Sequence, residues 1–498
     1  MPFAIEQIHG LALNHFGLHG RIRKLPGEID LNFQMTLHSG QKFVLKIANP
    51  ATERAQLEMQ NAIMQHLGAQ DLGLEIPFVV ASLDGQRITE ITAPDGSRRF
   101  LRLLTWIEGR CFADVNPHTP ALLENVGEMC GKLALGLAGF EHPAAHRFLK
   151  WDCSQAAWTR EHLPKIADAD KRGLAEYFLQ LFEKQAIPAL PDLRQSICYN
   201  DANDYNILVG HDLLAPQVPG VIDFGDAVYT HTINELAIAA AYCAMHKPDP
   251  LTAIAHLVAG FHRRFPLTEK EVEVLFPLIG ARLLISVTCS AMNRADEPEN
   301  EYLQISDRPA WALLERLRAV PPALAHYTFR HACGWEPCPQ NAVFQAWAKA
   351  NFQTISPLVK SDISNLASGI WLDLSVGSPD LGTWADIEDA DKLHRRILEA
   401  IEAGGTLKTQ DSKPIPAIGR YDEIRPFYTS DAYAVEGNDG PQWRTAHIGL
   451  DVFLPPGTPV FAPLDGRVHS FQNNAADRDY GPTIILEHRV ELPPGPLK

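Results

Sequence analysis

The first hundred residues show the alternation of apolar and polar positions that predicts a sheet, interrupted by one helix. Residues 21–49 alternate on both sides of a Ser-Gly turn, as the strands of an antiparallel hairpin do. Residues 51–70 instead carry apolar side chains at helical spacing up to a glycine. Residues 88–109 alternate again around a Pro-Asp-Gly turn, which predicts a second hairpin. Residues 1–105 are therefore expected to form a β-rich lobe.

Further along the chain, the pattern becomes mostly helical. Apolar residues at helical spacing fill long stretches such as 121–140, 235–246 and 272–292. Two short acidic turns lie between these stretches. We expect residues 106–335 to form a helical lobe beside the smaller β-rich lobe, with a cleft between the two.

The remaining residues predict a separate C-terminal domain. Residues 336–420 are expected to contain a helical segment and a linker, because the stretch 408–419 combines proline, lysine and polar residues without periodicity. Residues 421–498 alternate as strands do, for example over 458–471, and predict an all-β domain. The last residues follow directly on a predicted strand, so we expect this domain to continue beyond Lys498. The predicted fold class is α+β, with two lobes and a C-terminal β domain.

The charge balance and the cysteines narrow the possible partners. The chain has 498 residues, with 60 acidic and 44 basic side chains and a formal charge of −16. Nucleic acids and anionic membranes need clustered Lys and Arg, so this balance argues against both as partners. The N-terminal residues lack the basic and apolar regions of a secretory signal, and no run approaches the ~18 apolar residues of a membrane span. Eight cysteines without zinc-type spacing are expected to be reduced thiols, which favours a cytoplasmic protein.

The first candidate site is CYNDANDYNILV at residues 198–209, where turn-forming acidic and amide residues precede an apolar strand. Phosphoryl transfer from a nucleotide needs a group that holds the acceptor hydroxyl and oxygen ligands that hold Mg²⁺. Asp201 and Asn206 supply both in the order D-x-x-x-x-N. Asp223 follows at the end of a second apolar strand, beside Gly225, where a carboxylate can approach a metal.

A lysine from the β-rich lobe would complete such a site by binding the phosphates. Lys46 lies on a predicted apolar strand, and Glu58 on the following helix is its expected anionic partner. Taken singly, these residues have simpler explanations, since a strand lysine is more often a surface residue and D-x-x-x-x-N occurs by chance. Their order along the chain, and their separation across the lobe boundary, favour the functional interpretation.

With these motifs, residues 1–330 resemble the aminoglycoside-phosphotransferase and choline-kinase superfamily, whose fold is protein-kinase-like. The segments NDANDYNILV and GVIDFGDAVY are most similar to its hydroxylysine-kinase branch. The resemblance implies that Asp201 is the catalytic base and that Asn206 and Asp223 hold Mg²⁺.

The same resemblance extends to the nucleotide. It implies that Lys46 pairs with Glu58 and binds the phosphates of ATP or GTP. The segment LLTWIEGR, which contains Trp106, falls where the family's hinge contacts the base. The dipeptide before Asp201 is Tyr-Asn where the family has His-Gly, and we expect activity to survive this change because that histidine supports the loop rather than the chemistry.

The family phosphorylates amino alcohols, aminoglycosides and related small molecules. An ammonium-bearing acceptor would need carboxylates or aromatic faces beside the base. Asp204, Asp226 and Trp106 are the candidates, although each is more often structural than a ligand. Glu235 is expected to cap or brace the helix after the metal turn. The expected partner is an amino alcohol such as hydroxylysine or ethanolamine, and the choice between ATP and GTP stays open.

A second candidate site lies in the C-terminal domain. His447 and Asp451 are four residues apart on a strand-like run and so share one face. The following GTPVFAPLDGRV resembles the lysostaphin-like metallopeptidase family. That family completes its zinc site with a later H-x-H motif, which His488 does not match. The resemblance therefore implies an incomplete, vestigial Zn²⁺ site with weak binding and no peptidase activity.

Two alternatives to a kinase stay open. The domain order resembles large bacterial fusions that continue into a class III, pyridoxal-phosphate-dependent aminotransferase-like domain, so a fused or associated lyase is an expected partner. The first alternative is an inactive pseudokinase that acts as a scaffold for this lyase. It is supported by the Tyr-Asn pair and by the single glycine in the expected phosphate turn at residues 25–33. The second, weaker alternative is a zinc metallopeptidase.

Overall fold

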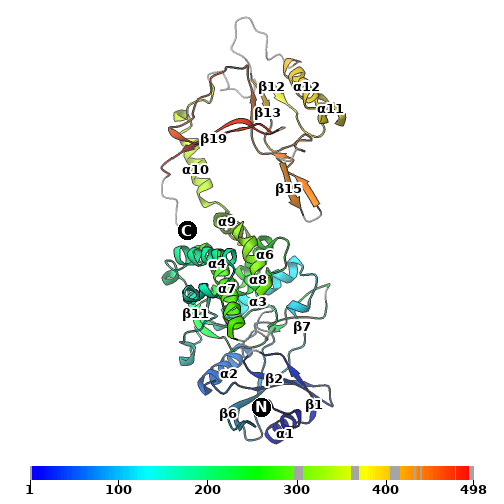
Figure 1. The fold of residues 1–498 in the computed structure, drawn as a ribbon, viewed down its shortest axis with the longest axis vertical. Helices are drawn as coiled ribbons and strands as arrows, with labels where there is room; N and C mark the ends of the chain where they lie inside the picture. Colours follow the sequence, from blue (N-terminus) through cyan, green and yellow to red (C-terminus); the bar gives the residue numbers. More distant parts are fainter. Residues whose placement is uncertain are drawn as a thin grey trace. The chain divides into compact units, whose positions relative to one another are not determined.

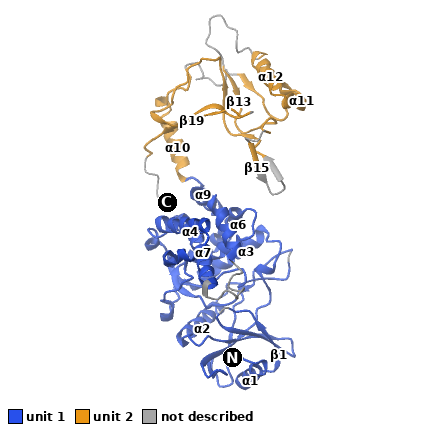
Figure 2. Cartoon of the chain, viewed as in Figure 1, with its two compact units in different colours: residues 1–338 blue, residues 339–498 orange. Residues whose placement is uncertain are grey.

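The chain forms two compact units, residues 1–338 and residues 339–498 (Figure 2). Each unit has a hydrophobic core built from its own residues. The computed structural model describes residues 3–27, 29–212, 214–296, 307–359, 370–403, 416–429, 433–437, 440–476 and 478–492.

The first unit begins with a β-rich lobe built on one antiparallel sheet of order β1-β2-β3-β6-β4, in which β5 also pairs with β6 (Figure 1). The two hairpins expected from the sequence, β2–β3 and β5–β6, are confirmed. The sequence analysis missed the first helix, α1. The elements of this lobe are α1 (Ile5–Phe16), β1 (Gly20–Leu25), β2 (Leu31–Leu37), β3 (Lys42–Ile47), α2 (Arg54–Gly68), β4 (Val79–Val80), β5 (Thr89–Thr92) and β6 (Arg98–Thr105).

The two faces of this sheet have different chemistry. On one face, apolar residues such as Phe33, Leu45 and Leu103 pack against α1. The other face lies toward α2, whose apolar residues share a core with Leu104 of β6. This second face also carries polar residues, because Lys46 lies directly opposite Arg102 in the strand register. A charged row on the inner face of a sheet marks the side where a polar ligand can be held.

The larger lobe is mainly helical (Figure 1), and buried apolar residues of α3, α5, α6 and α7 contribute to its core. Short strand pairs carry the loops that were singled out in the sequence. Its elements are β7 (Arg110–Cys111), η1 (Phe112–Asp114), α3 (Pro120–Leu137), η2 (Pro143–Ala145), η3 (Cys153–Lys165), α4 (Ala169–Leu181), η4 (Phe182–Ala186), η5 (Leu190–Asp192), β8 (Gln195–Cys198), β9 (Ile207–Val209), β10 (Gly220–Val221), β11 (Val228–His231), α5 (Asn234–Cys243), α6 (Pro250–Arg264), α7 (Glu269–Asp296), α8 (Asp307–Arg318) and α9 (Pro322–Ala332).

Helices α3 and α6 touch backbone to backbone through glycines. A Cβ atom added to Gly127 of α3 would lie 2.0 Å from the carbonyl oxygen of Leu257. A Cβ atom added to Gly260 of α6 would lie 1.9 Å from the carbonyl oxygen of Glu124. The absence of a side chain at both positions sets the distance between the two helices.

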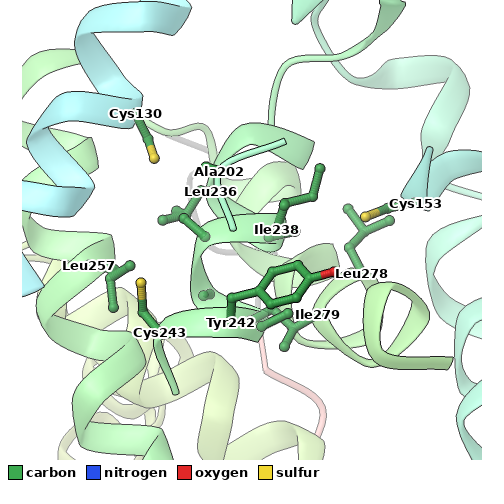
Figure 3. Close-up of a cluster of buried hydrophobic side chains, with 14 of the residues drawn as sticks. Cys130, Cys153, Ala202, Leu236, Ile238, Tyr242, Cys243, Leu257, Leu278 and Ile279 are labelled. Atoms are coloured by element: carbon green, nitrogen blue, oxygen red, sulfur yellow. The ribbon is translucent and has the colours of Figure 1, made fainter. Parts of the chain in front are cut away.

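The core of this lobe is apolar and contains cysteines. In Figure 3, Cys130, Cys153 and Cys243 lie around a cluster that includes Tyr242 and Leu278. All eight cysteines are free thiols and six of them are buried. They contribute to the core as small apolar side chains.

Among the described residues, one helix is long and apolar enough to cross a membrane by length and composition. This helix is α7, over Glu269–Arg294, and 94% of its most apolar window is buried in the structure. It therefore serves as a core helix of the lobe.

The second unit combines helices with short strands (Figure 1). Strand β13 pairs with β12 and with β18, so the segments expected on either side of residue 420 share one sheet. The end of the expected linker is therefore a buried strand, and the stretch 408–415 lies outside the described residues. The elements are α10 (Pro339–Ala350), η7 (Phe352–Thr354), β12 (Ile370–Leu372), η9 (Pro379–Leu381), α11 (Trp384–Glu388), α12 (Ala390–Ala403), β13 (Ala417–Gly419), β14 (Glu423–Ile424), β15 (Ala434–Gly437), β16 (Gly440–Trp443), β17 (Ala446–His447), β18 (Asp451–Phe453), β19 (Gly466–Asn474) and β20 (Gly481–His488).

Candidate active site

Lys46 links the two lobes of the first unit. It lies on β3 with 8% of its surface exposed. Its Nζ donates a hydrogen bond to Oδ2 of Asp223 at 3.1 Å and lies 3.9 Å from Oδ2 of Asp30. Asp223 follows β10 of the larger lobe, so this bond brings together two residues that the sequence analysis assigned to one site.

The expected pairing of Lys46 with Glu58 needs a correction. Glu58 accepts a hydrogen bond from Nε of Arg54 at 2.9 Å, and about half of its side chain is exposed. Glu58 therefore lies on the solvent side of α2. The buried polar residues of that helix are Gln60 and Asn61, which face the sheet instead.

Gln60 and Asn61 hold Arg102, a second buried cation that was not expected from the sequence. Arg102 donates hydrogen bonds to Oε1 of Gln60 at 2.7 Å and to Oδ1 of Asn61 at 3.0 Å. Burial lowers the pKa of the Arg102 guanidinium to about 10, although the carboxylates of Asp30 and Asp223 oppose this shift. Its signal in the sequence is a lone arginine inside the apolar run FLRLL, where burial requires a partner.

The loop with Asp201 is held by its own amide side chains. Asn203 donates to Oδ1 of Asp201 at 2.9 Å, and Asn206 donates to Oδ2 at 2.6 Å. The side-chain oxygen of Asn203 also accepts the backbone N–H groups of Tyr205 and Asn206, which closes an Asx-type turn. Both oxygens of Asp201 are thereby fixed, so the crowded asparagines of this stretch have a structural role.

Asp223 lies in a tight turn beside this loop. Its backbone has φ +62°, in the left-handed region, and its Oδ1 accepts the N–H of Gly225 at 3.1 Å. The N–H of Ile222 donates to the carbonyl of Asn206 at 3.0 Å, which ties the two turns together. Burial raises the pKa of Asp223, but the Lys46 ammonium and the N–H of Gly225 outweigh it and hold the pKa below its usual value. The Asp223 carboxylate is therefore ionised, and its oxygen atoms can bind a cation.

Asp201 has the opposite electrostatic environment. Burial raises its pKa well above the ordinary value, the carboxylate of Asp226 adds to this rise, and the guanidinium of Arg282 opposes it. Arg282 of α7 lies 3.6 Å from Oδ1 of Asp201 and has 2% of its side chain exposed. It also donates to the carbonyl of Trp151 at 2.5 Å. Arg282 was not expected from the sequence, because it lies inside a long apolar helix.

The backbone of the dipeptide before Asp201 is held by hydrogen bonds to Glu235 of α5. Both Glu235 and Asn200 are fully buried, and the Glu235 carboxylate accepts the N–H groups of Tyr199 and Asn200. The hydroxyl of Tyr199 donates to the carbonyl of Ile222. Asn200 has φ +63°, a conformation that glycine adopts freely and asparagine tolerates. Glu235 was expected to cap or brace its own helix, and its carboxylate instead holds the backbone of this loop from the first turn of α5.

The three candidate acceptor residues lie in different surroundings. Asp226 belongs to the turn after Asp223 and acts electrostatically on Asp201. Burial raises the pKa of Asp204, and its cationic neighbours are His246 and Lys247. Trp106 follows β6, and its ring lies 5.8 Å from Nζ of Lys42. Of the three, Asp226 is the candidate supported by its electrostatic effect on Asp201.

The second unit brings His447 and Asp451 together as expected. Nε2 of His447 lies 3.6 Å from Oδ1 of Asp451, close to the roughly 3.3 Å that separates two ligands of a tetrahedral zinc. Tyr428 bonds to Nδ1 of His447, and Arg425 donates to Oδ2 of Asp451 at 2.6 Å. Tyr428 and Arg425 therefore fix the positions of His447 and Asp451. Within the part of the chain that the structure describes, no group of three His, Cys, Asp or Glu side chains could hold a metal.

The fold and the first site define a class of protein. The chain belongs to the phosphotransferase enzyme family APH, which it matches over residues 21–269. It has the bilobal, protein-kinase-like fold expected from the sequence, and it is a phosphotransferase with an alcohol group as acceptor. It is 29% identical to hydroxylysine kinase from Mus musculus over 340 residues, which cover 63% of this chain and 89% of the mouse protein.

Two further comparisons agree with this assignment. Hydroxylysine kinase from Danio rerio is 30% identical over 325 residues, covering 63% of this chain and 90% of the fish protein. The solved structure of a microcompartment-associated aminopropanol kinase matches with a TM-score of 0.50 and 18% identity, over 63% of this chain and 98% of that one. This structural match shows the shared fold.

Proposed function

We propose that the protein is a small-molecule kinase that transfers the terminal phosphate of ATP or GTP to the hydroxyl group of an amino alcohol such as hydroxylysine or ethanolamine. The observation that carries this proposal is the 3.1 Å contact between Nζ of Lys46 and Oδ2 of Asp223, which joins the lobes beside the Asp201–Asn206 loop. The similarity to hydroxylysine kinases supports an acceptor that carries both an amine and a hydroxyl.

Asn206 and Asp223 suit a magnesium ion. The Asp223 carboxylate is ionised, and the amide nitrogen of Asn206 is engaged by Asp201, which leaves the amide oxygen as the ligand atom. When bound, Mg²⁺ would neutralise charge on the transferring phosphate. Lys46 would bind the phosphates directly, since its donor already faces this side of the site.

Asp201 would hold the acceptor hydroxyl. As the acceptor oxygen forms its bond to phosphorus, the bond to the leaving nucleoside diphosphate breaks and the hydroxyl proton passes to Asp201. A loose transition state needs little base strength, so orientation is the larger contribution. The two amide donors and Arg282 provide it by fixing the Asp201 carboxylate.

An acceptor ammonium group would be bound by the carboxylates beside Asp201. Burial raises the pKa of Asp201, and repulsion from the Asp226 carboxylate raises it further. A cation between them would relieve this repulsion and favour the ionised form of the base. Asp204 is a second candidate, with a half-buried carboxylate on the same loop.

The test is nucleotide turnover with a panel of amino alcohols, with ATP and GTP tried separately. Asp201→Ala and Asp223→Ala are expected to lower turnover by at least about a hundredfold. Asp84→Ala is the control, since Asp84 is an exposed aspartate of the β-rich lobe. Equal turnover in the wild type and in both site variants would remove the proposal.

A pseudokinase that acts as a scaffold for a pyridoxal-phosphate-dependent lyase is the second candidate. It rests on the Tyr-Asn pair and on the single glycine of the phosphate turn. Its distinguishing result is a calorimetric failure of the purified protein to bind Mg-nucleotide. Nucleotide binding without turnover of any amino alcohol would keep it as the better description.

For the second unit, we propose a lysostaphin-like β domain whose vestigial zinc site binds weakly. His447 and Asp451 supply two ligands, and the hydrogen bond from Arg425 already engages one oxygen of Asp451. Zinc titration is expected to show weak binding that His447→Ala removes. Stoichiometric zinc that survives dialysis, together with peptide cleavage, would favour the metallopeptidase instead.

The kinase reaction and its nucleotide suit a cytoplasmic protein, in which a fused or associated class III aminotransferase-like lyase would act on the phosphorylated product.

A further inference from the structure

Two cations lie side by side on the inner face of the small sheet. Lys46 of β3 and Arg102 of β6 are directly opposite each other in the antiparallel register. Lys46 is 8% exposed and Arg102 is 2% exposed. Neighbouring buried cations repel each other and require anions or bound ligands nearby.

Two carboxylates supply this compensation in the free protein. Oδ2 of Asp223 accepts the Lys46 hydrogen bond at 3.1 Å, and Oδ2 of Asp30 lies 3.9 Å from the same Nζ. Arg102 interacts electrostatically with both carboxylates. The group of Lys46, Arg102, Asp30 and Asp223 is therefore formally neutral.

Asp30 comes from a different part of the chain than Asp223. It immediately precedes β2, in the turn between β1 and β2, and its side chain is 19% exposed. Its Oδ1 accepts the backbone N–H of Asn49 at 3.1 Å, which holds the carboxylate between the start of β2 and the end of β3. Asp30 is thus a partly accessible anion beside the lysine that would bind phosphate.

We propose that Asp30 stands in for a nucleotide phosphate on the Lys46–Arg102 pair, and that the phosphates displace it when the nucleotide binds. The proposal rests on the proposed function, in which Lys46 receives these phosphates. Asp223 is reserved for the metal ion in that reaction, so Asp30 is the anion left to compete with phosphate for the two cations. A competing carboxylate weakens nucleotide binding and stabilises the nucleotide-free protein.

The same geometry gives Arg102 a role beside Lys46 that differs from the ion pair expected of Glu58. The inner side of α2 is coupled to the sheet through Gln60 and Asn61, which hold the Arg102 guanidinium. Arg102 is thereby a positioning residue, which adds positive charge beside Lys46 without pointing into solvent. The helix thus supports the phosphate side of the site through two neutral amides instead of an acidic residue.

The experiment measures binding of a non-hydrolysable ATP analogue and Mg²⁺ to the full chain, by calorimetry and without any acceptor. Asp30→Asn is expected to tighten binding by about tenfold, because the competing charge is lost. Arg102→Met is expected to weaken it by about tenfold, and Arg102→Lys by less, because the charge is retained. Asp84→Asn and Arg21→Met, exposed residues of the same lobe, are matched controls expected to bind within about twofold of the wild type.

Thermal unfolding separates the proposed role of Asp30, competition with the nucleotide phosphates, from a merely structural role. Without nucleotide, Asp30→Asn is expected to melt at a lower temperature, and with nucleotide its stabilisation is expected to exceed that of the wild type. Unchanged or weaker nucleotide binding by Asp30→Asn overturns the proposal, and so does unchanged binding by folded Arg102→Met. If the wild type binds no nucleotide at all, the proposed function fails together with this inference.

Discussion

Asn200 shows how one residue adapts to the backbone of the loop that carries Asp201. It is fully buried with φ +63°, and neither its amide oxygen nor its amide nitrogen has a hydrogen-bond partner. Asparagine tolerates this left-handed conformation better than other residues with a side chain, but its unpaired amide is costly. The family's glycine at this position avoids both costs.

This environment predicts a contrast between two substitutions of Asn200. Asn200→Gly is expected to stay within about 1 kcal/mol of the wild type in unfolding free energy, since glycine adopts φ +63° freely. Asn200→Ala is expected to be about 1–2 kcal/mol less stable than Asn200→Gly, because a Cβ is disfavoured there. Urea unfolding of the three proteins measures the difference, and equal stability of the two variants would contradict the structural explanation.

Glu235 makes stability depend on pH. Burial raises its pKa from 4.5 to about 7, while the N–H groups of Tyr199 and Asn200 favour the ionised form. Because the folded-state pKa is the higher one, the folded protein holds a proton that the unfolded chain releases between about pH 4.5 and 7. The contribution of Glu235 to stability is therefore greatest below pH 4.5 and is lost as the pH rises through 7.

The matching variant is Glu235→Gln, which does not titrate. Relative to this variant, the wild type is expected to lose roughly 3 kcal/mol of unfolding free energy as the pH rises from about 4.5 to above 7. This loss follows from the rise of the Glu235 pKa from 4.5 to about 7 on folding. Denaturant unfolding at pH 4.5 and pH 8 measures the loss. The same pH dependence in both proteins would show that Glu235 titrates normally.

At the scale of elements, helices α3 and α6 pack more closely than side chains would allow. Gly127→Ala would place a methyl group about 2.0 Å from the Leu257 carbonyl oxygen, so the helices must move apart. We expect a loss of about 3 kcal/mol in unfolding free energy. The control is Gly173→Ala in α4, where an added Cβ meets nothing within 4 Å and a gain of about 0.5–1 kcal/mol is expected. A similar effect of both substitutions would mean that helix contact is not the cause.

At the scale of the whole molecule, the division at residue 338 predicts that the first unit folds by itself. Its core clusters are built from its own residues, and the family match lies wholly inside it. A fragment of residues 1–338 is expected to unfold in one cooperative step and to keep the amino-alcohol kinase activity within about twofold of the full chain. Loss of nucleotide binding in a soluble fragment would show that the second unit contributes to the site.

Much of the fold was predictable because it depends on local patterns. The alternation around the Ser-Gly and Pro-Asp-Gly turns predicts the two hairpins, and the helical spacing predicts α2. Strand β13 was missed, because its three residues close a stretch that composition alone assigns to a linker. Helix α1 was also missed, although Ile8, Ala12 and Phe16 are spaced for one face of a helix.

The sequence by itself determined the residues whose chemistry is local. Asp201 and Asn206 lie in one turn, where the side-chain amides of Asn203 and Asn206 fix both oxygens of the aspartate. Only the tertiary structure decided what these residues meet from elsewhere. Lys46 and Asp223 are 177 positions apart, and Arg282 reaches Asp201 from the core of a helix that looks purely apolar. Such contacts depend on the strand register and on which face of a helix is buried. A charged residue whose partner is distant in the sequence does not change the periodicity of apolar positions, so the sequence pattern does not reveal it.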